Sequence, residues 1–200
     1  MMNLYLIGFR CSGKSTIGRF LSNQLCLSFI DTDSMVMEAC GSTIREWVDA
    51  HGWDAFRRLE SDILKGVSTQ SNQVVATGGG IVLYESNIIA MKASGLVVWL
   101  RIRPETTASR MATDPNSGML RPGLSGNDPI IEINDLLRQR TPLYQKASDL
   151  TIDCDDSRPE QIADIILSWI QEIRLWPEIH SEHCSASPPG ENLTAPPSGS

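Results

Sequence analysis

The sequence has little of what membrane proteins and nucleic-acid-binding proteins need. No stretch approaches the roughly 20 apolar residues of a membrane span, and the short apolar run at the start leads directly into a glycine-rich loop, which excludes a signal peptide. Basic charge is also scarce, because 24 acidic residues outnumber 17 lysines and arginines and the formal net charge is −7. We therefore expect a cytoplasmic protein with no membrane and no nucleic-acid partner.

Several other patterns are missing. The five cysteines are scattered and form no CxxC pair, which argues against a zinc site and against a disulfide framework. We expect reduced thiols. The chain also has no internal repeat and no NKxD pattern, which GTPases use to bind guanine. Its length of 200 residues suits one domain with a sizeable core.

The most informative stretch is a phosphate-binding loop near the start. Residues 8–16, GFRCSGKST, match the pattern GxxxxGK[ST] between a short apolar run and a helical pattern. In that setting backbone N–H groups and the positive end of a helix bind phosphates, whereas the alternative is an ordinary glycine turn. Lys14 is expected to reach the terminal phosphates and Ser15 to bind Mg²⁺. The predicted ATP contacts in this loop are Gly8, Arg10, Cys11, Ser12, Gly13, Lys14, Ser15 and Thr16.

Apolar segments of strand character alternate with helical patterns along most of the chain. We expect strands at residues 3–7, 27–33, 73–77, 96–100 and 150–153, and helices near 16–25, 34–66, 85–93, 104–111, 130–140 and 159–175. This alternation predicts an α/β protein of the P-loop NTPase fold, with a five-stranded parallel sheet flanked by helices. Turn-forming residues at 112–128 predict a mobile lid, and the Pro/Ser-rich residues 177–200 predict a disordered tail.

Two predicted strands end in residues suited to a binding site. Asp31 and Asp33 end the second strand and would point the same way on an extended chain; an aspartate that caps the next helix is the alternative. The triplet of residues 78–80, all glycine, follows the third strand and suits a backbone that approaches a ligand closely, although a hinge is also possible. No acid follows that strand, so Asp31 is the candidate carboxylate for Mg²⁺.

Six motifs occur in the order and rough spacing of shikimate kinases, and the chain resembles that family from residue 4 to residue 175. The motifs are GFRCSGKSTIG at 8–18, DTD at 31–33, FRRLE at 56–60, GGG at 78–80, LRP at 120–122 and RTPLY at 140–144. The resemblance implies a monomeric kinase domain at residues 1–176, with a substrate-binding helical segment at about 33–62. It also implies the reaction, in which ATP phosphorylates the 3-hydroxyl of shikimate in the chorismate pathway to aromatic amino acids.

The resemblance also assigns roles to residues. Family members bind the shikimate carboxylate with arginines that match Arg57 and Arg140, and an acid that matches Glu60 orients the first of them. Asp33 matches the carboxylate that holds the ring hydroxyls, and Arg121 matches the arginine of the lid. The catalytic residues would be Lys14, Asp33 and Arg121; the substrate ligands Asp33, Arg57, Glu60, Gly78, Gly79, Gly80 and Arg140; and the metal ligands Ser15 and Asp31. Arg121 would also contact ATP, because the lid arginine closes onto the phosphates and neutralises the charge that develops there. Arg110, just before the predicted lid, is our own candidate for stacking on adenine.

The chain departs from the family pattern at three places: the lid at 112–128 looks longer than the shortest family versions, the adenine-contacting loop near 153–159 matches poorly, and one residue of the phosphate-binding loop differs. Cys11 stands where most family members carry glycine, although a β-carbon there is compatible with the motif. The thiol would lie beside bound phosphate, where Lys14 and Arg10 favour a reactive thiolate; inert packing is the alternative. Two other functions stay open at this point: a gluconate-type sugar-acid kinase, and a degenerate relative that binds nucleotide or a partner protein without catalysis.

Overall fold

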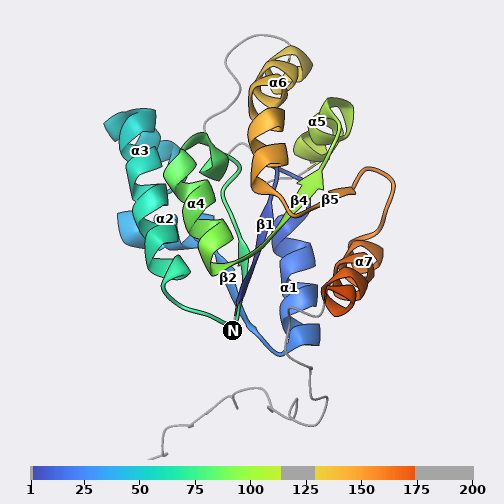
Figure 1. Cartoon of the computed structure of the whole chain (residues 1–200). Helices are drawn as coiled ribbons and strands as arrows, with labels where there is room; N and C mark the ends of the chain where they lie inside the picture. Colours follow the sequence, from blue (N-terminus) through green and yellow to red (C-terminus); the bar gives the residue numbers. More distant parts are fainter. Residues whose placement is uncertain (1, 114–128, 174–200) are drawn as a thin grey trace, which may run out of the picture.

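A computed structural model of the chain describes residues 2–113 and 129–173 (Figure 1). Five parallel strands form one sheet in the order β2-β3-β1-β4-β5, which confirms the predicted fold. Because β1 lies in the middle, the loop that follows it opens at the centre of the carboxyl edge, where parallel sheets bind ligands. The strands are β1 (Asn3–Ile7), β2 (Ser28–Asp31), β3 (Gln73–Ala76), β4 (Gly95–Arg101) and β5 (Leu150–Asp153).

Helices cover both faces of the sheet (Figure 1). One face is packed by α1 (Lys14–Leu25) and α7 (Pro159–Glu172), and the other by α3 (Ile44–Ser68), α4 (Glu85–Ser94) and α6 (Pro129–Ala147). The remaining helices are α2 (Thr32–Cys40), α5 (Pro104–Thr113) and the short 3-10 helix η1 (Ile81–Leu83). In the described part of the chain, no helix is both long and apolar enough to cross a membrane.

The central strands have apolar residues on both faces, as expected of a parallel sheet between two helical layers. In β1, Leu4 and Leu6 pack toward α1 and α7, whereas Tyr5 and Ile7 pack toward α3, α4 and α6. Continuous burial of this kind explains why these strands appear in the sequence as unbroken apolar runs.

The second strand is shorter than the sequence predicts. It ends at Asp31, and Asp33 lies in the first turn of α2, so the prediction that these carboxylates point the same way on an extended chain is wrong. The physical reason is helix capping. The Asp31 side chain accepts hydrogen bonds from the backbone N–H groups of Asp33 (3.0 Å) and Ser34 (3.4 Å), and the helix therefore begins at Thr32, before the predicted start at residue 34.

Other element boundaries also differ from expectation, and the helical stretch predicted at 34–66 consists of two helices, α2 and α3. The helix predicted to end at Arg140 continues through Pro142 to Ala147, because burial of Tyr144 and Ala147 against the sheet outweighs the hydrogen bond that proline removes. Strand β4 begins at Gly95, one residue before the predicted strand at 96–100. Of the predicted lid, Ala112 and Thr113 belong to α5. The rest of it, with Arg121, and the predicted tail at 177–200 lie outside the described residues.

Gly95 tests how tightly β1 and β4 pack against each other in the middle of the sheet. A β-carbon there would overlap the backbone of Asn3, its partner in β1. We expect Gly95→Ala to lower the free energy of unfolding by about 1–3 kcal/mol, measured by urea unfolding. The matched control is Gly66→Ala in α3, where a β-carbon meets no atom within 4 Å; it should raise stability by roughly 0.5–1 kcal/mol. Equal effects at the two sites would contradict this view of the β1–β4 contact.

Candidate active site

The phosphate-binding loop joins β1 to α1 at the centre of the sheet. Gly8 (φ 145°) and Gly13 (φ 91°) adopt conformations that side chains rarely allow, and a β-carbon on Gly8 would lie 2.5 Å from the carbonyl oxygen of Leu100. No side chain caps the start of α1 at Gly13. The loop therefore has the backbone geometry that the sequence motif requires for binding phosphate.

Lys14 is buried inside this loop, with 8% of its surface exposed. Its Nζ donates to the carbonyl oxygens of Gly8 (2.9 Å) and Phe9 (2.8 Å) and lies 3.3 Å from Ser12 Oγ. These three contacts hold the ammonium group of Lys14 inside the loop, as expected for the lysine of a phosphate-binding loop.

The two predicted metal ligands lie in direct contact. Ser15 Oγ donates a hydrogen bond of 2.6 Å to Asp31 Oδ2, while Oδ1 of the same carboxylate caps α2. A hydroxyl and a carboxylate are oxygen donors of the kind that Mg²⁺ prefers, so the pair fits this ion. Among the described residues, no group of three or more His, Cys, Asp or Glu side chains converges on a metal site. An ion bound here would therefore complete its coordination with phosphate oxygens and water.

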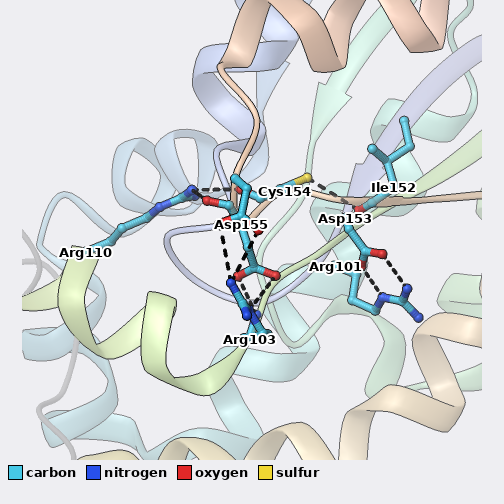
Figure 2. Close-up of polar contacts among 8 residues, drawn as sticks. Arg101, Arg103, Arg110, Ile152, Asp153, Cys154 and Asp155 are labelled. Atoms are coloured by element: carbon cyan, nitrogen blue, oxygen red, sulfur yellow. Dashed lines mark hydrogen bonds and ion pairs between the residues drawn. The ribbon is translucent and has the colours of Figure 1, made fainter.

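A cavity of about 450 Å³ lies beside the loop. Arg110 lies at its wall and donates hydrogen bonds to the carbonyl oxygens of Cys11 (3.1 Å) and Cys154 (2.7 Å), as Figure 2 shows in part. Burial raises the pKa of the Cys154 thiol to about 12, so that thiol stays protonated. The wall is formed by the phosphate-binding loop, α1, α5, α7 and the residues between β5 and α7: Cys11, Ser12, Gly13, Thr16, Ile17, Arg110, Cys154, Ser157, Pro159 and Ile162.

The glycine triplet lies on the other side of the loop and is in contact with the predicted substrate ligands. A β-carbon on Gly78 would overlap Glu60 and approach Asp33 Oδ1 to 2.9 Å, and one on Gly80 would overlap the guanidinium of Arg57. None of the three triplet residues has a positive φ. Glycine is therefore needed for space at Gly78 and Gly80, where the backbone passes directly beside charged side chains, whereas a β-carbon on Gly79 would meet no atom closer than 3.4 Å.

Arg57 and Glu60 form a nearly buried ion pair on α3. The helix is broken at Gly52 (φ 81°), and its second half presents both side chains to the triplet. Arg57 Nη1 lies 2.5 Å from Glu60 Oε2, with the side chains 13% and 2% exposed. Burial raises the pKa of Glu60, an effect that Arg57 and then Arg140 oppose. The second oxygen, Oε1, has no hydrogen-bond partner among the described residues.

Helix α6 closes this side of the site. Tyr144 Oη donates to the carbonyl oxygen of Gly79 (2.5 Å), and Arg140 Nη1 donates to the same oxygen (3.2 Å). The Arg140 guanidinium lies 5.5 Å from the centre of the Phe9 ring, and that of Arg10 lies 5.8 Å from it. Burial lowers the pKa of Arg10, and the positive charges of Arg140 and Arg57 lower it further.

The structure thus brings the predicted substrate ligands together: Asp33, Arg57, Glu60, Gly78, Gly79, Gly80 and Arg140. Arg10, predicted to bind ATP, lies near two of these arginines. Two residues that lie in the quoted motifs but were given no role in the sequence analysis hold the triplet in place. They are Tyr144, four residues after Arg140 and therefore on the same helix face, and Thr32, whose Oγ1 accepts the N–H of Gly78 (2.9 Å).

Comparisons with known proteins agree with this geometry. A family model described as shikimate kinase matches residues 10–171. The shikimate kinase of Nitratidesulfovibrio vulgaris is 43% identical over 145 residues, which cover 72% of this chain and 82% of that protein. That of Trichormus variabilis is 40% identical over 173 residues, with coverages of 86% and 92%. A solved structure, shikimate kinase from Acinetobacter baumannii in complex with shikimate, has a TM-score of 0.81 and 32% identity, and the match covers 88% of this chain and 96% of that one.

Tyr144 gives a test of the α6 contact. Burial raises its pKa from 10 to about 12, so the neutral phenol stabilises the fold fully below pH 10, and this contribution is lost as the pH rises toward about 12. Tyr144→Phe should lower the free energy of unfolding at pH 7 by about 1 kcal/mol. In a titration by tyrosinate absorbance, recorded directly after rapid jumps to each pH, it should remove the step that occurs at the highest pH. The exposed Tyr84→Phe is the control and should keep that step. Survival of the step in Tyr144→Phe would contradict the assignment.

Proposed function

Because the chain belongs to the shikimate kinase family, we propose that it phosphorylates the 3-hydroxyl of shikimate with ATP, giving shikimate 3-phosphate and ADP. The observation that supports this most strongly is the packing of Arg57, Glu60 and Asp33 against the bare backbone of the glycine triplet. That group of charged side chains lies beside a complete phosphate-binding loop, so an acceptor and a nucleotide can meet at one edge of the sheet.

The acceptor side suits a small hydroxy-carboxylate. Arg57 and Arg140 are planar donors that can bind a carboxylate in a bidentate manner. Glu60 holds the first guanidinium through one oxygen, and the carbonyl of Gly79 holds the second. Both arginines are therefore oriented before an acid arrives, which reduces the entropy that binding costs. The ring hydroxyls would be bound by Asp33 and by backbone groups of the triplet.

The nucleotide side supplies the phosphoryl group. We assign the phosphates to the backbone N–H groups of residues 8–16 and to Lys14, and the base to the cavity beside Arg110. Ser15 would bind Mg²⁺ directly and Asp31 through water, and such an ion would supply charge neutralisation on the phosphates. Arg121 keeps its proposed role in neutralising charge as the phosphoryl group moves. A cytoplasmic location and a monomeric state also remain predictions.

Transfer depends mainly on how the acceptor is placed. The transition state is loose, so little base strength is needed, and Asp33 would contribute chiefly by aligning the hydroxyl and then taking its proton. Lys14, enclosed by the loop, would stabilise the negative charge on the transferred phosphoryl group.

The function is tested by ATP turnover with shikimate, quinate, gluconate and nucleoside monophosphates assayed in parallel. Wild type should turn over shikimate, and Arg57→Ala and Arg140→Ala should each weaken shikimate binding by about 2–5 kcal/mol while leaving ATP affinity within a few-fold. The control is Arg58→Ala, since that neighbour of Arg57 is exposed and should change neither constant. Turnover of gluconate in place of shikimate would refute the proposal. A large loss of ATP affinity in Arg57→Ala or Arg140→Ala would show that these arginines bind the nucleotide.

For Arg10 we predict a contact with shikimate and not with ATP, because it lies near the two arginines of the acceptor side. Its guanidinium and that of Arg140 both lie near the Phe9 ring, and the positive charge of Arg57 lowers the pKa of Arg10. Arg10→Met should raise the dissociation constant of shikimate by roughly ten-fold, about 1.4 kcal/mol, and that of ATP by less than about two-fold, both measured by calorimetry. Arg19→Met, which removes an arginine from another phenylalanine ring, Phe29, is the control. If ATP affinity falls and shikimate affinity does not, Arg10 is a nucleotide ligand.

A further inference from the structure

Cys11 has an unusual backbone conformation for its position. Its φ is 61°, in the left-handed region that costs an L-residue with a β-carbon free energy but costs glycine almost none. Among the described residues, the other non-glycine positions with positive φ are Cys26, at the end of α1, and Asn72, directly before β3. Of these three residues, Cys11 lies within the phosphate-binding loop. Because its own side chain disfavours the left-handed conformation, contacts from other parts of the chain must stabilise it.

The carbonyl oxygen of Cys11 is held by a charged donor from a distant part of the chain. Arg110, in the last turn of α5, donates to it through Nη1 at 3.1 Å. Its Nη2 donates to the carbonyl oxygen of Cys154 at 2.7 Å and lies 3.5 Å from that of Asp155 (Figure 2). The guanidinium therefore joins the loop to the end of β5. Hydrogen bonds from charged donors are stronger than those between neutral groups.

Fixing this oxygen also fixes an N–H group of the loop. The peptide between Cys11 and Ser12 is planar and trans, so its N–H points opposite to its C=O. The Ser12 N–H lies 3.4 Å from the carbonyl oxygen of Phe9, which also accepts from Lys14 Nζ (2.8 Å). Arg110 thus holds the carbonyl on one side of the peptide while the N–H faces the interior of the loop.

We propose that Arg110 is a positioning residue for the phosphate-binding loop, which holds the Cys11–Ser12 peptide in a left-handed geometry that cysteine at position 11 disfavours. This role rests on the proposed function in one respect, which is that the loop binds ATP. It acts through the backbone of Cys11 and is separate from any contact between Arg110 and the base. Glycine at position 11 would adopt the same geometry unaided, and the loop would then depend much less on Arg110.

The other end of α5 offers a matched control. Arg103, just before the helix, donates its backbone N–H to Asp155 Oδ1 (2.9 Å), and its side chain lies 3.2 Å from Oδ2 (Figure 2). Arg103 therefore ties α5 to the same stretch after β5, but the hydrogen bonds and ion pairs of its side chain with described residues are to Asp155 and Asp156 and not to the phosphate-binding loop. Arg103→Met loosens the attachment of α5 without removing the donor to Cys11.

The test is a double-mutant cycle on ATP affinity, measured by calorimetry without an acceptor. Arg110→Met should raise the dissociation constant of ATP about ten-fold in the natural sequence, as expected for loss of a charged hydrogen bond. In the Cys11→Gly background the same change should cost less than about three-fold. Arg110→Lys, which keeps the charge and one donor direction, should recover part of the loss. Arg103→Met should have the same small effect in both backgrounds.

Equal losses from Arg110→Met in the two backgrounds would overturn the proposal, because Arg110 would then act on the nucleotide directly. Thermal melting of every variant identifies any that fails to fold, and Arg110→Lys in the two backgrounds then provides the same comparison. Shikimate affinity, measured in the same proteins, should stay within about two-fold in each variant. A wild type that binds ATP but does not phosphorylate shikimate would refute the proposed function and leave this cycle interpretable.

Discussion

The acceptor side of the site depends on a strip of backbone that carries no β-carbons. Gly78 and Gly80 leave the space that Glu60 and Arg57 occupy, and a side chain at either glycine would push one member of the ion pair away. The strip is itself held from two directions, by Thr32 at the N–H of Gly78 and by Tyr144 at the carbonyl of Gly79. Because interiors are close-packed and transmit small displacements, these fixed contacts determine where the arginines lie.

The strand order brings this strip next to the phosphate-binding loop. β3 pairs with β1 on one side and with β2 on the other, so three segments far apart in sequence end at neighbouring points of one edge. The loop follows β1, the glycines follow β3, and Asp31 ends β2. A hydrogen bond between Ser15 and Asp31 then joins the nucleotide side to the start of α2. The fold thus places an acceptor and a phosphoryl donor side by side without a long connecting segment.

Much of this could be predicted from the sequence, for identifiable reasons. Buried parallel strands are continuous apolar runs, and the phosphate-binding motif fixes its own flanking elements. Asp33 was misplaced because an aspartate at a strand end and one that caps a helix look alike in sequence, and here Asp31 caps a helix that already contains Asp33. Pro142 suggested a helix end, but tertiary burial of Tyr144 outweighed it. The contact between Arg110 and Cys11 joins residues 99 positions apart, which no local pattern reveals.

The charges of the acceptor side explain how it accommodates Glu60, a buried acid. Arg10, Arg57 and Arg140 lie close enough for the latter two to lower the pKa of Arg10. Glu60 offsets one positive charge and orients Arg57, yet its own burial raises its pKa, so ionising it is costly. Replacing it with an apolar residue would leave a buried arginine unpaired, which is costlier still. The arginines therefore keep the acceptor side positive, which favours an acidic acceptor. The orientation of Arg57 is set by Glu60 before the acceptor binds.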